Sequence, residues 1–494
     1  MEKTLIIGFS VAMIVASFLI GWWAKRKVTS NKAFFGSTGM FGPLAVGLSS
    51  TAAVASAFAL VGVPGIIYAT GNPMTFWMLS SAAFTMAYII LGKKVRAMAE
   101  IGEVASLGDI SDLRFNNNRL IKALLSVVIF LGCIAYLSAQ IKAGSELFAH
   151  LLGWEPIVAA FVIFGILTVY TAISGEVGGL LTQAFQGLVM VVAGVIMIVS
   201  FYAMTGGFGN VMQAVGSLKE AVGGDVTKPL GPDFLNAWGR MPGTISMVWM
   251  LIPILGTIGQ PQVLTRMYAL KNPKEMPKLS LYAALSHAIV GFFAVVVAYG
   301  VLYLVATGKV NPLAVADRAI FVFADEAGFI AQLFVYAAVL AAAMSSASLF
   351  LSICAGIISR DLPSALGMKI PENRQITASR ITMFAIGIIS IFFSIYRGDM
   401  VAILGTFGWG TLMSATFPVF IIGLLWDRAN EAGVMTGMIA SLGLNLLSLT
   451  SFKWPGGMPG YFYIIAIAVS LTIFVSLMTK EQKLNKKLQA VIDL

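Results

Sequence analysis

Two adjacent serines stand in the middle of a long apolar run, and their hydroxyl oxygens are the clearest candidates for chemistry. The segment 341–352 reads AAAMSSASLFLS, with Ser345 beside Ser346 and Ser348 close by. A hard cation such as sodium takes oxygen ligands, and carbonyls and hydroxyls can supply them without a carboxylate. The same small side chains would also suit a face on which another helix packs closely. The pattern alone leaves both interpretations open.

Freed backbone carbonyls would complete such a cation site, and two further apolar runs contain residues that interrupt a helix. They are Gly62, Pro64 and Gly65 in the run 44–70, and Pro253, Gly256, Gly259 and Pro261 in the run that begins at 242. Proline removes a helical donor, and glycine permits an unwound backbone. Such carbonyls are tolerated at membrane depth only where they line a cavity or lie inside protein. Gly and Pro are also common in ordinary membrane helices, which is the alternative.

Composition places the whole chain in a membrane. Of its 494 residues, 58% are hydrophobic and only 11% are charged, whereas a soluble domain carries about a quarter charged residues. The runs are apolar on all faces, which excludes the alternation of a membrane barrel. The net charge of +10 is explained by basic loops between apolar runs, so nucleic acid is not an expected partner. No G-x-x-x-x-G-K-[ST] phosphate loop is present in the sequence.

The apolar runs predict an all-α membrane protein with about 13 transmembrane helices. The predicted spans are 5–23, 44–70, 74–92, 123–150, 156–175, 180–205, 242–258, 279–306, 329–358, 381–396, 401–425, 434–450 and 461–478. The first span is followed, not preceded, by Lys25, Arg26 and Lys27, so we interpret it as a retained helix and not a signal peptide. The side of the C-terminus collects 23 of the 32 Lys and Arg residues. This bias predicts an outside N-terminus and a cytoplasmic C-terminus in the cell membrane.

The two interrupted runs stand at matching places, which predicts a repeat. If each begins a unit of five spans, the units are 44–205 and 242–425, and an odd number of spans makes the second unit inverted. The remaining segments are an extra helix with its loop at 1–43, an external loop at 206–241, and two helices with a cytoplasmic tail at 426–494.

Several segments resemble the sodium:solute symporter family. They are Gly62-Val63-Pro64-Gly65, GQPQVLTR at 259–266, AAAMSSAS followed by Ile358-Ser359-Arg360-Asp361-Leu362, and YTAISGEVGGLLTQAFQGLVM at 170–190. The resemblance implies a five-plus-five inverted repeat of the LeuT type, with one helix before it and two after. It also implies a sodium site between the second and ninth spans. By position, its ligands would be the carbonyls of Ala52, Ala55 and Ala342 and the hydroxyls of Ser345 and Ser346.

Two departures from relatives in this family bear on the number of ions. Some members have an aspartate where this chain has Val54, and many have one where this chain has Gln183. We therefore expect one sodium ion per cycle and no proton coupling through a core carboxylate. In proline carriers the seventh span offers Trp and Tyr to the solute. The matching positions here are Pro253 and Thr257, so we expect a solute other than proline.

Few polar residues lie within the spans, and they are the candidates for gating and solute contact. Lys142 and Glu146 are four residues apart, so they share a helix face and could pair near the outer surface, either as a gate or as ordinary interfacial residues. The candidate solute contacts are Ala57, Phe58, Gln140, Thr257 and Gln260.

Together these features predict a secondary active transporter that carries a small organic solute, an organic acid or an amino acid, into the cell with sodium. The other interpretations that stay open are a proton-coupled carrier and a sensor built on a transporter fold. A channel would need a filter or charged ring, and a membrane enzyme would need clustered His, Asp or Cys in the core. The sequence shows neither pattern, and we expect no enzymatic activity. The expected partners are the solute, sodium and the lipid bilayer.

Overall fold

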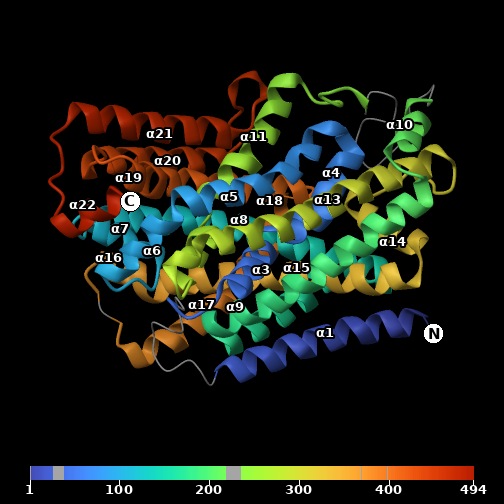
Figure 1. Ribbon diagram of the computed structural model, residues 1–494, viewed down its shortest axis with the longest axis horizontal. Helices are drawn as coiled ribbons and strands as arrows, with labels where there is room; N and C mark the ends of the chain where they lie inside the picture. Colours follow the sequence, from blue (N-terminus) through green and yellow to red (C-terminus); the bar gives the residue numbers. More distant parts are fainter. Residues whose placement is uncertain (1, 26–37, 218–234, 369, 398) are drawn as a thin grey trace.

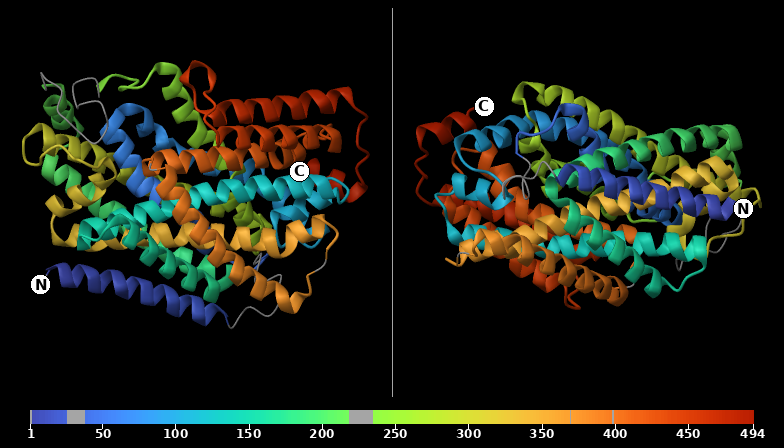
Figure 2. Two further views of the ribbon diagram at one scale, coloured as in Figure 1. Left: turned by 180° about the vertical axis from the view of Figure 1, so that it is seen from behind. Right: turned by 90° about the horizontal axis from the view of Figure 1, so that it is seen from below.

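The structure, a computed structural model, describes residues 2–25, 38–217, 235–368, 370–397 and 399–494. The described part is a bundle of long helices that run roughly along the longest axis of the molecule, with the two chain termini toward opposite ends (Figure 1). Helix α1 (Glu2–Lys25) lies along one flank, and α20 (Glu431–Ser448) and α21 (Gly460–Met478) lie along the other (Figures 1 and 2). The core of the bundle lies between these flanks.

Burial separates the central helices from the peripheral ones. The most apolar window is 89% buried in the candidate span Phe329–Ala365, which begins with α15 (Phe329–Gly356). It is 83% buried in Val401–Leu425, which begins with α18 (Val401–Thr416), and 78% buried in Pro273–Ala306, which contains α13 (Met276–Ala306). The corresponding share is 28% for both α1 and α21. The other long helices are α8 (Arg119–Leu152), α9 (Pro156–Thr205) and α17 (Glu372–Arg397). The serine-rich segment therefore lies on one of the most enclosed helices.

The second predicted span is broken, as expected, but at a different place. Helix α3 (Pro43–Val54) ends before Ala55, and the chain continues as the π-helical turn η1 (Phe58–Gly62) and α4 (Val63–Thr70) at a bend of 53°. The glycines assigned to the interruption serve close packing instead. A Cβ on Gly62 would meet the backbone nitrogen of Ala402 at 2.9 Å, and one on Gly65 would meet Asp317 at 2.9 Å. The break itself occurs in a run of Ala and Ser, which carries no strong breaking signal.

The interrupted run that begins at 242 is broken at Gln260, just after the predicted seventh span, between α11 (Gly243–Gly259) and α12 (Pro261–Ala269). Gln260 has an extended backbone, with ψ of 136°, and Pro261 begins the next helix, where its missing N–H costs no helical hydrogen bond. Gly256, ahead of the break, lets the Trp409 indole approach, since a Cβ there would meet Nε1 at 2.1 Å. Here the sequence signal and the break coincide.

The number of helices that are long and apolar enough to span a membrane differs from the predicted 13. In the described residues, eight helices are long and apolar enough to cross a membrane, or nine with the bent pair α3 and η1–α4. The expected spans 156–175 and 180–205 form one continuous helix, α9, of 50 residues, or about 75 Å at the helical rise. A single crossing needs about 20 residues, so this helix is far longer than one span.

Shorter elements connect the long helices. At the end that carries the C-terminus they are η4 (Pro273–Glu275), α6 (Gly92–Ile101), α7 (Leu107–Arg114), η6 (Ile357–Asp361), α16 (Leu362–Ala365), η7 (Phe417–Ile422), α19 (Gly423–Leu425) and α22 (Lys486–Ile492). The other connecting elements are η2 (Asn72–Leu79), α5 (Ser80–Ile90), α10 (Phe208–Gly216), η5 (Ala316–Arg318), α14 (Ala319–Ala327) and η8 (Pro455–Gly457). The expected external loop 206–241 thus contains a short helix, α10, and its residues 218–234 lie outside the described part.

The contact between α3 and α9 depends on the missing side chain of Gly187, which gives a test of the packing. A Cβ at Gly187 would meet the carbonyl oxygen of Leu48 at 2.4 Å, whereas a Cβ at Gly165 of the same helix has nothing within 4 Å. We expect Gly187→Ala to lower the free energy of unfolding by about 1–3 kcal/mol through overpacking. Gly165→Ala is the matched control and should be neutral or slightly stabilising. Denaturant unfolding in mixed micelles measures both, and equal stability of the two variants would contradict this packing.

Candidate functional site

Hydroxyl–carbonyl hydrogen bonds join the end of α3 to the middle of α15. Ser345 Oγ donates to the carbonyl oxygen of Ala52 at 2.7 Å, and Ser346 Oγ donates to that of Ala53 at 3.1 Å. These carbonyls belong to the last turn of α3, where the break removes their helical partners. All four residues are fully buried. The break supplies bare carbonyl oxygens, and α15 supplies the hydroxyls that meet them.

This oxygen cluster fits a sodium ion chemically. The carbonyl oxygen of Ala342 belongs to it, because it accepts a further hydrogen bond from Ser345 Oγ at 3.0 Å. Each hydroxyl keeps lone pairs for a cation, and its proton can rotate away from the ion. Two hydroxyls and three carbonyls in one buried place are hard oxygen donors, which sodium takes in exchange for its water shell.

The structure brings together four of the five expected ion ligands, Ala52, Ala342, Ser345 and Ser346. Ala55 stays a prediction, because the contacts from α15 reach the carbonyls of Ala52 and Ala53. Sequence reasoning missed the carbonyl of Ala53. The exact residue at which a helix ends decides which carbonyls are free, and the run of Ala and Ser did not mark that residue.

Gln183 of α9 links four helices beside the oxygen cluster. Its Oε1 accepts hydrogen bonds from Ser49 Oγ of α3 at 3.0 Å and from Arg266 Nη2 of α12 at 2.5 Å. Its Nε2 donates to the Ser345 carbonyl at 3.1 Å and to Ser348 Oγ at 3.2 Å, both on α15. A neutral amide therefore occupies oxygens of α15 that would otherwise be available to a cation.

Four aromatic rings pack together beside the break in α3, and we call them the aromatic box. They are Phe58 of η1, Trp77 of η2, Tyr136 of α8 and Trp409 of α18, all at most 1% exposed. Their ring centroids lie 5.0 Å apart for Phe58 and Trp77, 5.7 Å for Trp77 and Trp409, and 5.9 Å for Tyr136 and Trp409. These are ordinary aromatic contact distances, so the four rings pack directly against one another.

Polar groups connect the aromatic box to the break. Gln140 Oε1 accepts a hydrogen bond from the Ala57 backbone at 3.0 Å, and Tyr136 and Ser56 join their hydroxyls at 2.7 Å. The expected solute contacts Ala57, Phe58 and Gln140 are therefore gathered at one place.

The second break reaches the same box through Gln260 and Trp409. Gln260 Nε2 donates to the Trp409 carbonyl at 3.0 Å, which connects α11–α12 to α18. Thr257 is buried on α11 nearby in the chain. Three buried polar atoms here have no hydrogen-bond partner among the described residues, namely Gln260 Oε1 and the indole nitrogens of Trp77 and Trp409.

Sequence reasoning missed three members of the box, Trp77, Tyr136 and Trp409. One local signal for Tyr136 exists, because it lies one helical turn before Gln140 and shares its face. Trp409 stands between Gly408 and Gly410, and both glycines are positions of close packing, against Tyr136 and Tyr461 respectively. No comparable local pattern marks Trp77.

At the end near α14, polar contacts join α8 and η5 to neighbouring segments. Glu146 of α8 pairs with Arg318 of η5 at 3.0 Å, and Asp317 accepts a hydrogen bond from the Val401 amide at 3.0 Å. Lys142 donates to the carbonyl of Asp399 instead of pairing with Glu146. The predicted pairing of Lys142 with Glu146 is therefore wrong. Each side chain instead contacts a group on another element. Both residues still tie α8 to neighbouring segments.

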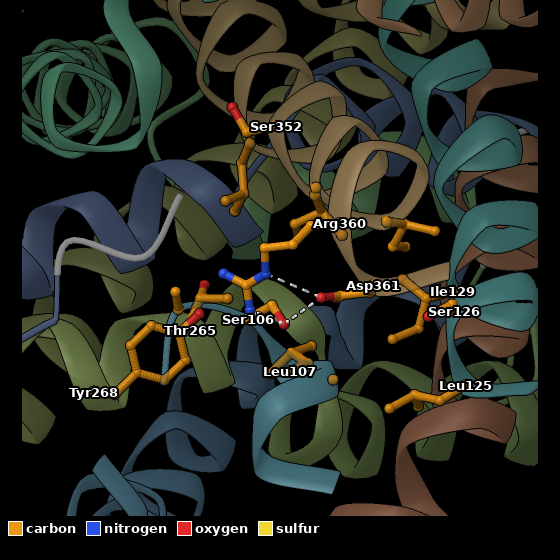
Figure 3. Close-up of a pocket in the computed structure, with 16 residues that line it drawn as sticks. Ser106, Leu107, Leu125, Ser126, Ile129, Thr265, Tyr268, Ser352, Arg360 and Asp361 are labelled. Atoms are coloured by element: carbon orange, nitrogen blue, oxygen red, sulfur yellow. Dashed lines mark hydrogen bonds and ion pairs between the residues drawn. The ribbon is translucent and has the colours of Figure 1, made fainter. Parts of the chain in front are cut away.

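At the opposite end, a cavity lies below the aromatic box between α8, α12, α15 and the start of α7 (Figure 3). Leu349 lines it, and the next residue, Phe350, packs on Tyr136 of the box with ring centroids 4.7 Å apart. Arg360 and Asp361 stand at the other side of this cavity and reach Ser106 (Figure 3).

An ionic network surrounds Arg360 and Asp361 at the edge of that cavity. Arg360 pairs with Asp109 and, at 3.4 Å, with Asp361, while Lys122 pairs with Asp112 at 2.7 Å. Burial raises the pKa of Asp112, and its hydrogen bond from Lys122 opposes that shift. The network joins α7 to α8 and to the end of α15. Opening the cavity at this end would require these ion pairs to separate.

A scan of protein-family models matches residues 34–441 to the sodium:solute symporter family. Curated relatives cover almost the whole chain. The osmoregulated proline transporter OpuE of Bacillus subtilis (strain 168) is 28% identical, over 91% of this chain and 90% of its own. The sodium/proline symporter 2 of Staphylococcus saprophyticus is 25% identical, over 85% and 81% of the two chains.

Solved structures agree on the fold. A sodium-coupled sialic acid symporter in its substrate-bound outward-open state superposes with a TM-score of 0.78 at 16% identity, over 98% of this chain and 99% of that one. A nucleobase-cation-symport-1 family transporter, closed with bromovinylhydantoin bound, gives a TM-score of 0.53 at 13% identity, over 94% and 99%. These likenesses confirm the expected all-α fold of the LeuT type.

Proposed function

The chain belongs to the sodium:solute symporter family, and from this membership we propose that it carries a small zwitterionic amino acid inward with one sodium ion held between α3 and α15. That it is a sodium-coupled transporter of the membrane, and not an enzyme, follows from the family and the relatives. The ion ligands, the solute and the orientation are the proposed parts.

We assign the ion to the oxygen cluster of Ala52, Ala53, Ala342, Ser345 and Ser346, with Ala55 as a further ligand. The observation that carries this assignment is the pair of hydrogen bonds from the α15 hydroxyls to the last carbonyls of α3. Sodium there would join two helices that belong to different parts of the bundle. It would favour the conformation in which both sets of oxygens converge, and its release would let them part. Such differential affinity between two states is what coupling requires.

One ion per cycle is supported by the neutral side chains at Val54 and Gln183, beside the oxygen cluster. Val54 is a buried apolar residue, and Gln183 directs its amide nitrogen at the oxygens of Ser345 and Ser348. An amide N–H and a cation compete for the same lone pairs. A second sodium ion would have to displace these hydrogen bonds, and no carboxylate there would balance its charge.

The aromatic box supports a zwitterionic solute. The indole N–H groups of Trp77 and Trp409 can donate to a carboxylate, and Gln260 Oε1 can accept from an ammonium group. Aromatic faces stabilise the positive charge further. The relatives are named as proline transporters, which favours proline against the expectation drawn from Pro253 and Thr257. In this site the rings come from η1, η2, α8 and α18, so a missing aromatic pair on α11 does not by itself exclude proline.

We further propose the N-terminus outside, the C-terminus in the cytoplasm, and inverted repeats at 44–205 and 242–425. The basic loops support the orientation. The two broken helices, α3–η1 and α11–α12, support the repeats, because each opens one unit and both reach the aromatic box. In this orientation, the Glu146–Arg318 ion pair lies toward the outside, and the cavity of Figure 3 lies toward the cytoplasm.

Uptake into proteoliposomes tests the proposal as a whole. With an inward sodium gradient we expect accumulation of proline or another small amino acid, and no accumulation when potassium replaces sodium. Organic acids that lack an ammonium group should compete poorly. Accumulation that persists without sodium and follows an imposed pH gradient would establish a proton-coupled carrier instead. Sodium-dependent binding without any accumulation would favour a sensor.

The ion site is tested by Ser345→Ala and Ser346→Ala. Each change removes one oxygen and little volume, so the protein should fold. The apparent sodium affinity should fall about tenfold or more, which is roughly 1.4 kcal/mol, and solute affinity should fall mainly at low sodium. Ser352→Ala, lower on the same segment, is the matched control and should keep the wild-type sodium dependence. If both serine variants also keep it, the ion binds elsewhere.

Stoichiometry is tested by the dependence of initial uptake rate on sodium concentration. The wild type should give a Hill coefficient near one, because Gln183 fills the neighbouring position with amide hydrogen bonds. Gln183→Asp returns an acid to this place and should steepen the sodium dependence, whereas Gln183→Glu adds a longer acid and serves as a comparison. A wild-type coefficient clearly above one would overturn the single-ion proposal.

A further inference from the structure

Two exposed apolar stripes run down neighbouring helices toward the end of the bundle that carries the C-terminus. On α5 the stripe includes Met86 and Ile89, which are 43% and 62% exposed. On α13 it includes Leu281 and Leu285, which are 54% and 57% exposed. Helices α5 and α13 pack against each other, so the stripes are adjacent. In a membrane protein, exposed apolar side chains of this kind face lipid tails.

Each stripe ends at lysine. The helical path continues from α5 into α6 through hydrogen bonds from Leu91 to Ala87 and from Val95 to Leu91, which places Lys93 one turn after Ile89. On α13, Lys278 precedes Leu281 by about one turn, and Lys274 lies in η4 just before that helix. Lys93, Lys274 and Lys278 are all exposed. The change from apolar to basic marks the level where tails give way to headgroups.

A groove of about 310 Å³ opens at this level between α6 and the loop before α13. Its accessible lining is almost wholly apolar and comes from Ala97, Pro273 and the aliphatic parts of the basic residues. Lys93, Arg96 and Lys274 add positive charge at the ends of those side chains. Glu100 is the one acidic side chain in the groove lining, and it is already paired with Arg96 at 2.6 Å. The acidic side chain of the lining is therefore committed to Arg96, and Leu494, with its terminal carboxylate, is the remaining lining residue.

The groove is rigidly built. Arg96 Nε donates to the carbonyl of Leu270 at 2.9 Å, which fixes α6 against the end of α12. Gly92 packs on the first residue of α13, since a Cβ there would meet Met276 Sδ at 2.7 Å. Lys94 donates to the carbonyl of Ile492, so α22 braces the outer side of α6. Such a groove keeps its shape without a ligand, which lowers the entropy cost of binding one.

We propose that this groove binds an anionic phospholipid. The phosphate would lie between Lys93 and Lys274, and the acyl chains would follow the stripes of α5 and α13. Positive charge and apolar surface meet here in the order in which a phospholipid presents phosphate and tails. A small soluble anion would use the lysines alone, and a nucleic acid would leave the adjoining apolar stripes uncovered. Basic pockets at the membrane surface recognise lipid headgroups by the same combination.

Native mass spectrometry of the full chain, released from nanodiscs, tests the proposal. The nanodiscs contain equal amounts of phosphatidylglycerol and phosphatidylcholine, and the wild type should retain phosphatidylglycerol in preference. In Lys93→Gln/Lys274→Gln the retained phosphatidylglycerol should fall at least threefold. Lys93→Arg/Lys274→Arg keeps the charge and should keep the lipid. The matched control is Lys309→Gln/Lys453→Gln, which removes two exposed lysines at the opposite end of the helices.

Three results would overturn the proposal. They are equal retention by the glutamine variant and the wild type, equal loss in the control pair, and displacement of the lipid by inorganic phosphate alone. The measurement requires no sodium and no solute, so its outcome is independent of the transport activity proposed above.

Discussion

The structure depends on one costly feature, a helix that stops in the middle of the apolar core. At the end of α3 the carbonyls of Ala52 and Ala53 lose their helical donors, and neither water nor lipid can replace them cheaply at this depth. The hydroxyls of Ser345 and Ser346 satisfy them. Helix α15 must therefore pass within hydrogen-bond distance of the break, and it can do so because its facing side chains are small. The enclosure of α15 inside the bundle follows from this requirement.

The same requirement explains the glycines around the site. Where α3–α4 and α18 approach each other, Gly62 meets the backbone of Ala402 and Gly405 meets Phe58, and a Cβ at either would collide. Close backbone approach is how membrane helices gain packing energy in the absence of a hydrophobic driving force between them. The aromatic rings of the box then fill the space that the bent helix leaves. The close helix packing and the aromatic box are consequences of the same bend.

Sequence reasoning reached the parts of this arrangement that are local. The apolar runs predicted the helical fold, and the candidates Ser345, Ser346 and Gln260 could be named because hydroxyl pairs and Gly–Pro patterns are visible in the chain. It misplaced the break in the second span, since Gly62, Pro64 and Gly65 mark close contacts and a π-helical turn, whereas the break lies in Ala and Ser. Trp77 and Trp409 were missed because their roles depend on helices far apart in sequence. The partners of Lys142 and Glu146 were wrong for the same reason.

The hydrogen bonds of Gln183 differ in strength from those that join α3 to α15, and this difference indicates where the bundle can move. Gln183 is covalently part of α9, and its bonds to Arg266 and to α15 include one charge-assisted hydrogen bond, which is stronger than a neutral one. Its link to α3 is a single hydroxyl of Ser49. The remaining links between α3 and α15 are also neutral hydroxyl bonds, each worth only about 0.5–1.5 kcal/mol net. A sodium ion at the cluster would strengthen this weak boundary, and its departure would weaken it again. The charge-assisted bond holds α12 to α9 with or without an ion, so an ion at the proposed cluster would act mainly on the boundary between α3 and α15.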